Sequence, residues 1–358
     1  MTSWDGSADW STFRERLQKT LDEFLDEMAE RLAPLGPDAA ALLEEARRCV
    51  SGGKRFRAAF CWWGFRAVRP DVDDEDALLR ACAALEMLHV SALVHDDYMD
   101  ASDTRRGRPA THRAFAAVHR SRSWRGDPDQ YGASAAILLG DLLLAWSDEL
   151  LRSCGLAPDR VVAALEVFDH CRTEVITGQF LDVSVQAHGH ADVDTAMTVL
   201  RYKSAKYSIE RPLHIGATLA GAGPDVLREL SAYGLPLGEA FQLRDDLLGV
   251  YGDPAATGKP AGDDLVEGKR TVLVALALDG ASAAEAARLD AALGTPLDEA
   301  RVAELRRIID ASGAHAHVEQ VIDELVAVAL GKLDASSLAQ PARQVLRELA
   351  SAATDRMV

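Results

Sequence analysis

Lysine and arginine are far fewer than aspartate and glutamate in this chain. The 358 residues include 39 Lys and Arg against 56 Asp and Glu, which gives a formal net charge of −17 at pH 7. Such an acidic surface argues against nucleic acid and against anionic membrane surfaces as main partners. It also means that an anionic ligand would need a local cluster of basic side chains, or bound metal ions, where it binds.

Paired cysteines and long apolar runs are lacking as well. The five cysteines form no CxxC pair, so we expect buried free thiols in a reducing cytoplasm rather than disulfides or a zinc site. The first ten residues are acidic and lack the apolar core of a secretory signal. The most apolar stretch, residues 135–144, is too short to cross a bilayer and contains Asp141. We therefore expect a soluble, cytoplasmic protein with no stable membrane insertion.

Long strand-like alternation is absent, and apolar residues recur at helical spacing almost everywhere. One such stripe contains Leu17, Leu21, Phe24, Leu25 and Met28. Hydrophobic residues make up 48% of the chain, which is enough to bury a large core. Breaks rich in glycine and proline separate the helices, but no low-complexity linker divides the chain. The sequence predicts an all-α fold in which residues 1–358 form a single large helical domain.

An aspartate-rich segment, LEMLHVSALVHDDYMDASDTRRGRPATH, begins at Leu85. Asp96 and Asp100 are one turn apart and share a helix face, and His89 lies on the same face. A solvated helix end is one interpretation, but the apolar flanking sequence favours a buried helix. Buried carboxylates without compensation are costly, and Mg²⁺ suits this arrangement because it takes one or two carboxylates together with phosphates and water.

A second aspartate-rich segment, FQLRDDLLGVYGDPAATGKPAGDDLVEGKRT, begins at residue 241. Its polar and glycine residues recur at helical spacing, with Asp245 beside a stripe made of Gln242, Asp246, Gly249 and Asp253. Gly249 costs helix stability relative to alanine, which indicates either close helix packing or a ligand or metal that approaches the backbone. Lys259 and Lys269 follow in a loop that could fold over phosphate oxygens.

Two aspartate clusters, each followed by a basic loop, together indicate diphosphate chemistry. Diphosphate is a poor leaving group until metal ions and Arg or Lys donors neutralise its charge. Six ordered motifs then resemble those of the trans-type (E) isoprenyl diphosphate synthases, or polyprenyl synthetases. They are GGKRFRA, HDDYMDASDTRRGRP, GQFLD, YKSAKYS, FQLRDDLLGVYGD and GKPAGDDLVEGK. The resemblance implies an all-α bundle around a deep central cavity, usually a homodimer, that joins isopentenyl diphosphate to an allylic diphosphate with Mg²⁺.

The resemblance also implies roles for individual residues. Three Mg²⁺ ions would be held by Asp96, Asp100 and Asp245, supported by Asp97, Asp246 and Asp253. The allylic diphosphate would be bound by Arg105, Lys203 and Lys259, with Lys269 in the same loop as the last. Isopentenyl diphosphate would be bound by Lys54, Arg57, His89 and Arg106. The developing carbocation would be faced by Gln179, Ser204 and Gln242. The catalytic set would comprise the carboxylates of both segments with Lys203 and Gln242.

Product length is expected to depend on the residues before the first aspartate motif. Ala92 lies one turn before Asp96, with Ser91 at its flank and Leu88 further along. In the resembling family bulky aromatics here form a floor that stops growth at C15. Because Ser91 and Ala92 are small, we expect growth past C15 and geranylgeranyl diphosphate (C20) as product, with longer chains or C15 as alternatives. These small residues could instead pack against a bulky neighbouring helix that closes the cavity.

Two rival interpretations make different demands on the sequence. A class I terpene cyclase also uses DDxxD, but it needs a second metal motif of Asn/Asp, Ser/Thr and Glu that we do not find. It would also lack a second diphosphate site, which Lys54, Arg57 and Arg106 would supply. A non-catalytic regulatory subunit should have lost some carboxylates, whereas both sets are intact here.

Overall fold

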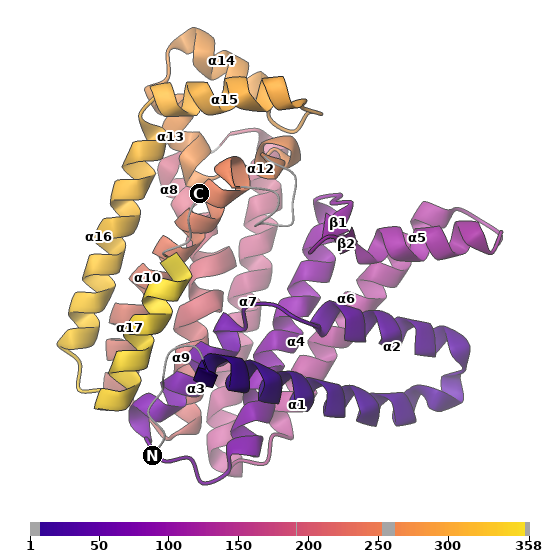
Figure 1. The fold of residues 1–358 in the computed structure, drawn as a ribbon, viewed down its shortest axis with the longest axis vertical. Helices are drawn as coiled ribbons and strands as arrows, with labels where there is room; N and C mark the ends of the chain where they lie inside the picture. The colour runs from indigo at the N-terminus through magenta and orange to yellow at the C-terminus, as the bar shows by residue number, and fades with distance from the viewer. Residues whose placement is uncertain (1–7, 191, 253–261, 355–358) are drawn as a thin grey trace. The chain divides into compact units, whose positions relative to one another are not determined.

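The computed structural model describes residues 8–190, 192–252 and 262–354, most of which lie in helices (Figure 1). The all-α prediction is confirmed. The chain divides into two compact units, one of residues 1–62 and 71–165, the other of residues 63–70 and 166–358. Helices α3 (Phe56–Val68) and α7 (Pro158–His188) each contribute to both units. A single domain over residues 1–358 stays a prediction.

The first unit is built on the packing of α4 (Glu75–Met99) along α6 (Pro128–Arg152), which Figure 1 shows. Its other elements are α1 (Ala8–Leu32), the 3-10 turn η1 (Ala33–Leu35), α2 (Pro37–Val50) and α5 (Thr111–Ser121). The short strands β1 (Thr104–Arg105) and β2 (Arg108–Pro109) pair antiparallel between α4 and α5. The apolar stripe predicted for α1 is its core face, since Leu17, Leu21 and Leu25 are fully buried.

Helix α4 is the central element of this unit. Its N-cap residue Asp74 accepts a hydrogen bond from the Ala77 amide at 2.9 Å, which satisfies one of the helix's free amide groups. Of the described helices, only α4 is long and apolar enough to cross a membrane, and 78% of its most apolar stretch is buried inside the protein. Such burial is typical of the core helix of a soluble protein.

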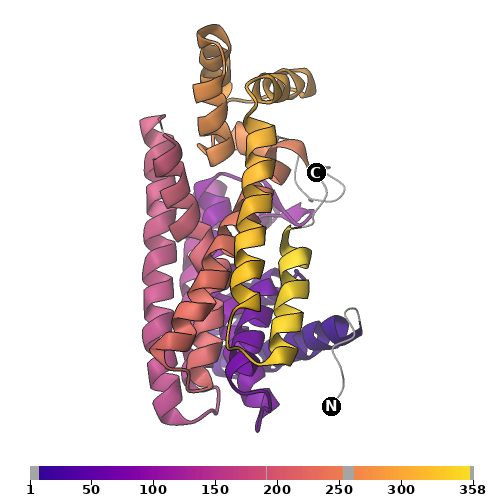
Figure 2. The same ribbon diagram turned by 90° about the vertical axis from the view of Figure 1, so that its left-hand side faces the viewer.

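The second unit contains a long helix, α10 (Pro224–Tyr251), that packs along α16 (Ala314–Asp334) and along the π-helix η2 (Arg201–Glu210) (Figures 1 and 2). The remaining helices are α8 (Val193–Leu200), α9 (Arg211–Leu219), α12 (Asp263–Glu267), α13 (Val272–Gly280), α14 (Ala283–Ala292), α15 (Glu299–Ala311) and α17 (Gln340–Thr354). A buried apolar cluster that includes Leu243, Leu247, Leu273 and Ile309 joins α10 to α13 and α15.

The cysteines are free thiols, as the sequence predicts. Cys61, Cys82, Cys154 and Cys171 are buried, and Cys49 is partly buried. Burial raises the pKa of the Cys49 thiol to about 12, and the nearby Glu45 carboxylate adds to this effect. A thiol held protonated in this way is a poor nucleophile and a poor metal ligand.

Candidate active site

The first aspartate segment occupies the C-terminal turns of α4. From His89 onward the partly exposed positions include Ala92, Leu93, Asp96 and Asp100, which recur at helical spacing on one face. Asp100 ends the helix, and its amide donates to the Asp96 carbonyl at 2.8 Å. The two aspartates and His89 therefore share one accessible face, as the spacing predicts.

The adjacent carboxylates Asp96 and Asp97 have different environments. Asp97 is buried, with a side chain 5% exposed, and accepts a hydrogen bond from Arg105 Nε at 2.7 Å. The Asp96 side chain is 20% exposed and lies 3.6 Å from Arg105 Nη2. Charge pairing of this kind stabilises both ionised groups. Asp97 therefore holds Arg105 in place, and Asp96 remains the more accessible carboxylate.

A tight β-turn presents the two arginines after α4. Arg105 ends β1, and the turn residues Arg106 and Gly107 both have positive φ, 53° and 73°. Positive φ at both central positions is the requirement of a type I′ hairpin turn. Arg106 Nη1 reaches back to the Ser51 carbonyl at 3.0 Å, and its guanidinium lies over Gly53, where a Cβ would be 2.9 Å from Nη2. Gly53 also has φ 99°, a left-handed backbone that favours glycine at this position.

Positive charge gathers around His89 in the first unit. Burial lowers the pKa of His89, and the surrounding arginines, Arg57 first and Arg106 next, lower it further. Lys54 is exposed and Arg57 is half-buried. Arg57 and Arg106 thus form a local cationic cluster around His89, and Lys54 precedes Arg57 by three residues. In a chain of net charge −17 this is the kind of site that an anionic ligand requires.

The second aspartate segment lies near the end of α10. Asp246 is 6% exposed and accepts a hydrogen bond from Gln242 Nε2 at 2.8 Å, whereas Asp245 is only partly buried. Burial raises the pKa of Asp246 well above its usual value, and the negative charge of Asp264 raises it further. Here too one carboxylate of the pair is accessible and the other is buried.

Asp264 is a residue that sequence reasoning did not assign to the site. A Cβ at Gly249 would lie 1.9 Å from Asp264 Oδ2, so the glycine admits this carboxylate to the face of α10. Lys269 Nζ lies 3.4 Å from Asp264 Oδ1 and also contacts the Glu267 carboxylate. Lys269, predicted to bind substrate, is thus held between two carboxylates. Lys259 and Asp253 lie outside the described residues.

Two of the predicted motifs, GQFLD on α7 and YKSAKYS on η2, contact each other. Lys203 Nζ donates to Asp182 Oδ2 at 2.6 Å, and a Cβ at Gly178 would lie 2.4 Å from the Lys203 amide nitrogen. Gln179 and Ser204 are both partly exposed. A ten-residue π-helix was not expected from the sequence, although π-helical turns are often found at functional sites. Asp182, in the GQFLD motif, is the second missed residue.

The residues predicted to set product length are not equally accessible. Leu88 is buried, and Ser91 is buried with its Oγ donating to the Gly140 carbonyl at 2.7 Å. Ala92 is partly exposed on the same face as Asp96. Ser91 therefore serves the packing of α4 on α6, and Ala92 alone of the three lies on the accessible face.

The aspartate carboxylates suit a metal ion whose remaining ligands are substrate phosphates and water. Within the described residues, no group of three or more His, Cys, Asp or Glu side chains forms a ready-made metal site. Mg²⁺ needs no such group, because one or two carboxylates suffice when phosphates and waters complete its octahedron. The partly exposed carboxylates of Asp96, Asp100 and Asp245 fit that requirement.

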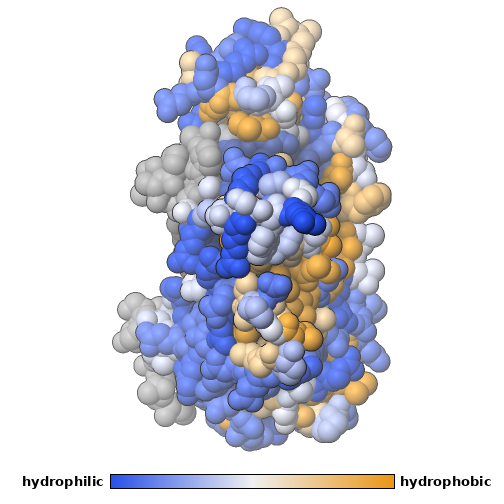
Figure 3. All heavy atoms as spheres, turned by 90° about the vertical axis from the view of Figure 1, so that its right-hand side faces the viewer, coloured by the Kyte–Doolittle hydropathy of each residue, from blue (hydrophilic) through white to orange (hydrophobic). Residues whose placement is uncertain are grey.

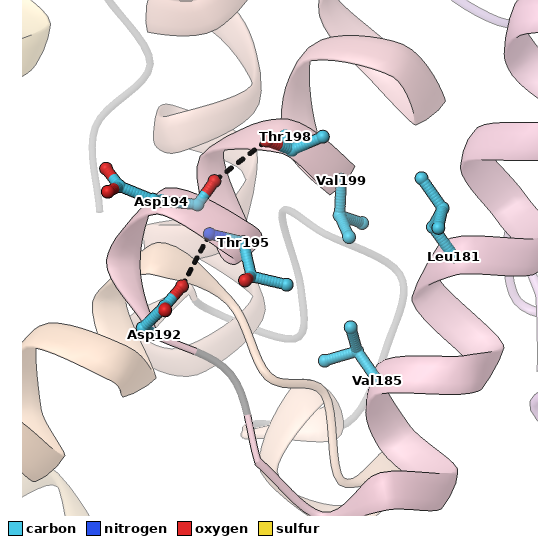
Figure 4. A pocket seen from close by; sticks show the side chains of 7 residues that line it. All are labelled: Leu181, Val185, Asp192, Asp194, Thr195, Thr198 and Val199. Carbon is cyan, nitrogen blue, oxygen red and sulfur yellow. Dashed lines mark hydrogen bonds between the residues drawn. The ribbon is translucent and has the colours of Figure 1, made fainter.

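A separate pocket of about 250 Å³ lies between α7 and α8 in the second unit (Figure 4). Leu181, Val185 and Val199 form its apolar side, and Asp192, Asp194, Thr195 and Thr198 its polar side. Asp192 Oδ1 caps α8 by accepting from the Thr195 amide at 2.7 Å. None of the predicted site residues lines this pocket.

Comparison with known proteins decides the family. The profile of the polyprenyl synthetase family matches residues 40–311, which is more than half of the chain. This chain belongs to the polyprenyl synthetase family. It is a prenyltransferase of the isoprenyl diphosphate synthase type, a family that uses isopentenyl diphosphate and an allylic diphosphate.

Two curated proteins and one crystal structure illustrate what this polyprenyl synthetase is similar to. It is 34% identical over 288 residues to the geranylgeranyl diphosphate synthase of Mycobacterium tuberculosis, covering 79% of this chain and 75% of that protein. It is 32% identical over 272 residues to the geranylfarnesyl diphosphate synthase of Aeropyrum pernix, covering 75% and 79%. A crystal structure of geranylgeranyl pyrophosphate synthase from Corynebacterium glutamicum, complexed with isoprenyl diphosphate and magnesium, is 41% identical. It covers 97% of this chain and 99% of that one, with a TM-score of 0.94.

Proposed function

We propose that this polyprenyl synthetase makes geranylgeranyl diphosphate (C20) by adding isopentenyl diphosphate to shorter allylic diphosphates. The observation that carries the product length is Ala92, a small side chain on the accessible face of α4, one turn from Asp96. No aromatic ring projects from that position to block a growing prenyl chain. The relatives named for geranylgeranyl and geranylfarnesyl products support an outcome longer than C15.

Metal binding is assigned to the accessible carboxylates. Asp96 and Asp100 would hold two Mg²⁺ ions and Asp245 a third, and the magnesium in the Corynebacterium complex supports this choice of metal. When bound, the ions supply the positive charge that lets diphosphate leave. Asp97 keeps Arg105 beside Asp96, and Gln242 orients the buried Asp246 through its 2.8 Å hydrogen bond.

The chain's own residues bind, orient and shield the reactants. Lys54, Arg57, His89 and Arg106 bind isopentenyl diphosphate, while Arg105, Lys203 and Lys259 bind the allylic diphosphate. The allylic C–O bond breaks with its electron pair going to diphosphate, and the terminal alkene of isopentenyl diphosphate attacks the allylic carbon. The carbon next to the new cation then loses a proton to the released diphosphate, and the electron pair of that C–H bond forms the new double bond. Gln179, Ser204 and Gln242 would face the cation, whose lifetime depends on exclusion of water.

Self-association and a cytoplasmic location are part of the proposal. Figure 3 shows apolar side chains at the surface on one face of the molecule. Exposed apolar residues include Ile137 and Leu138 on α6, 44% and 61% exposed, and Ile176 and Phe180 on α7, 56% and 67% exposed. Large exposed apolar side chains that recur on one element favour a protein interface. A homodimer that packs through either helix would cover such side chains, and a reducing cytoplasm suits the free thiols.

Product analysis tests this function. The purified enzyme is incubated with isopentenyl diphosphate and each short allylic primer, and the dephosphorylated products are separated by chromatography. We expect C20 from the wild type and a shift toward C15 in Ala92→Phe. The matched control Ala117→Phe, on the exposed side of α5, should leave product length unchanged. A wild-type product that is exclusively C15 would overturn the assignment of Ala92, and cyclic hydrocarbons would favour a terpene cyclase.

A further inference from the structure

Arg55 lies in the GGKRFR motif between Lys54 and Arg57, yet its environment is the opposite of theirs. Its side chain is 2% exposed, whereas Lys54 is exposed and Arg57 is half-buried. Its backbone has φ 59°, the left-handed region that non-glycine residues seldom adopt. A residue held in that conformation is kept there by its surroundings. The contacts of the side chain show what those surroundings are.

The Arg55 guanidinium joins three helices of the first unit. Its Nη1 donates to Glu86 Oε2 on α4 at 2.9 Å, and its Nη2 donates to Gln18 Oε1 on α1 at 2.6 Å. The same Nη2 donates to the Val50 carbonyl at the end of α2 at 2.5 Å. The Glu86 side chain is 3% exposed. A buried arginine and glutamate with this many hydrogen bonds fix one geometry, because removal of either leaves an uncompensated buried charge.

The Arg55–Glu86 pair is adjacent in sequence to the residues of the cationic cluster. Glu86 precedes His89 by three residues on α4, so the two share a helix face. Arg55 is one residue after Lys54 and two before Arg57. Arg55 is drawn inward to Glu86, whereas Lys54 before it is exposed and Arg57 after it is half-buried. Arg55 also adds to the positive charge that lowers the pKa of His89, and its hydrogen bonds to three helices add a fixed geometry to that charge.

We propose that Arg55, locked by Glu86, is a positioning residue that sets Lys54 and Arg57 for the diphosphate of isopentenyl diphosphate. The inference rests on the proposed function of the cluster. Neither Arg55 nor Glu86 is proposed to contact the substrate. A fork-shaped guanidinium is required here, because it makes hydrogen bonds to Glu86, Gln18 and Val50 at once and a lysine has no such planar fork.

Steady-state kinetics with each substrate varied in turn tests the proposal. We compare Arg55→Gln, Glu86→Gln and the double variant with wild type, and include Arg80→Gln as matched control. Arg80 also lies on α4 and also reaches α1, through Glu27 at 3.1 Å, but it is away from the cluster. Arg55→Gln should raise KM for isopentenyl diphosphate by about tenfold or more, with kcat and the allylic KM changed by less than about threefold. Glu86→Gln, which leaves the Arg55 backbone untouched, should raise the same KM by about threefold.

The double variant separates positioning from general damage. With both charges removed no charge is left buried and unpaired, so its KM for isopentenyl diphosphate should be no higher than that of Arg55→Gln alone. Equal losses toward both substrates, or an unchanged KM for isopentenyl diphosphate in a folded variant, would overturn the inference. If Arg55→Gln does not fold, Glu86→Gln decides by the same criterion. Wild-type enzyme without any turnover of isopentenyl diphosphate would refute the proposed function itself, which keeps the two failures distinguishable.

Discussion

The two aspartate-rich helices look alike in sequence, but they compensate their buried carboxylates differently. On α4 the buried Asp97 accepts a charged hydrogen bond from Arg105 at 2.7 Å. On α10 the buried Asp246 accepts only the neutral amide of Gln242, at 2.8 Å. Burial raises the pKa of Asp246, the charges of Asp264 and Asp245 raise it further, and the Gln242 hydrogen bond and Lys269 offset this only in part. Among the contacts that the structure describes, the buried carboxylate on α4 is thus paired with a cation, whereas the one on α10 is paired with a neutral amide.

The largest expected effect is on turnover, and it should be shared by both helices. Asp96→Ala and Asp245→Ala should each lower kcat by at least about 100-fold, since each removes an oxygen that would hold metal on the leaving group. Removal of divalent metal by EDTA should stop turnover in the wild type, and Mg²⁺ should restore it. The measurement is kcat at saturating substrates.

Controls on the same helices sharpen this prediction. Asp76→Ala and Asp225→Ala remove exposed aspartates from the first turns of α4 and α10, with side chains 93% and 82% exposed. Both control variants should retain near-normal rates. If one of the two site variants also keeps a normal rate, the helix that carries it is not a metal-binding helix, and the symmetry assumed between the segments is wrong.

A smaller effect should separate the basic residues of the two units. Arg57→Ala should mainly raise KM for isopentenyl diphosphate, and Lys203→Ala should mainly impair use of the allylic substrate. Each side chain would make a charge-assisted contact worth roughly 1.5–3 kcal/mol, so a change of about tenfold or more is expected. The test is the pair of KM values measured for each variant. An identical pattern in both variants would mean that the two diphosphate sites are misassigned.

Helical periodicity explains which parts of the site could be predicted. The shared face of His89, Ala92, Asp96 and Asp100 follows from spacing along one helix, as does the buried stripe of α1. The motif order also identified the family. The shared face and the buried stripe are local in sequence and the motif order is read along the chain, so none of these needs knowledge of how distant segments meet.

Features that join distant segments could not be predicted in the same way. The pairing of Arg55 with Glu86 spans 31 residues, and that of Lys203 with Asp182 spans 21. Asp264 reaches Gly249 only because α12 folds back on α10. The sequence indicated that Gly249 admits something close to the backbone, but not that the neighbour is a carboxylate. The sequence likewise does not show that the Ser91 hydroxyl donates to the Gly140 carbonyl on α6, a contact between distant segments.

The smallest expected effect tests the difference between the two buried carboxylates directly. In metal-free buffer at pH 7.5, Asp97→Asn should lower the thermal midpoint by roughly 2–6 °C, because it weakens a charged hydrogen bond to Arg105 worth about 1.5–3 kcal/mol. Asp246→Asn should instead raise the midpoint by roughly 1–3 °C, because the amide carries no charge beside Asp264 and Asp245. Both substitutions preserve side-chain shape, so their opposite signs would reflect the charge alone.

The pH dependence of the Asp246→Asn effect gives the sharper form of this test. In the unfolded chain an aspartate titrates near about 4, whereas burial and Asp264 raise the pKa of Asp246 in the folded protein. Between those two pKa values the folded state binds more protons, so wild-type stability should fall as pH rises and the penalty is complete above the folded pKa. The advantage of Asp246→Asn should therefore be largest at high pH and vanish as pH falls toward about 4. A variant less stable than wild type at pH 7.5 in EDTA would mean that the Asp246 carboxylate has an adequate counter-charge of its own, and the contrast with Asp97 would then be lost.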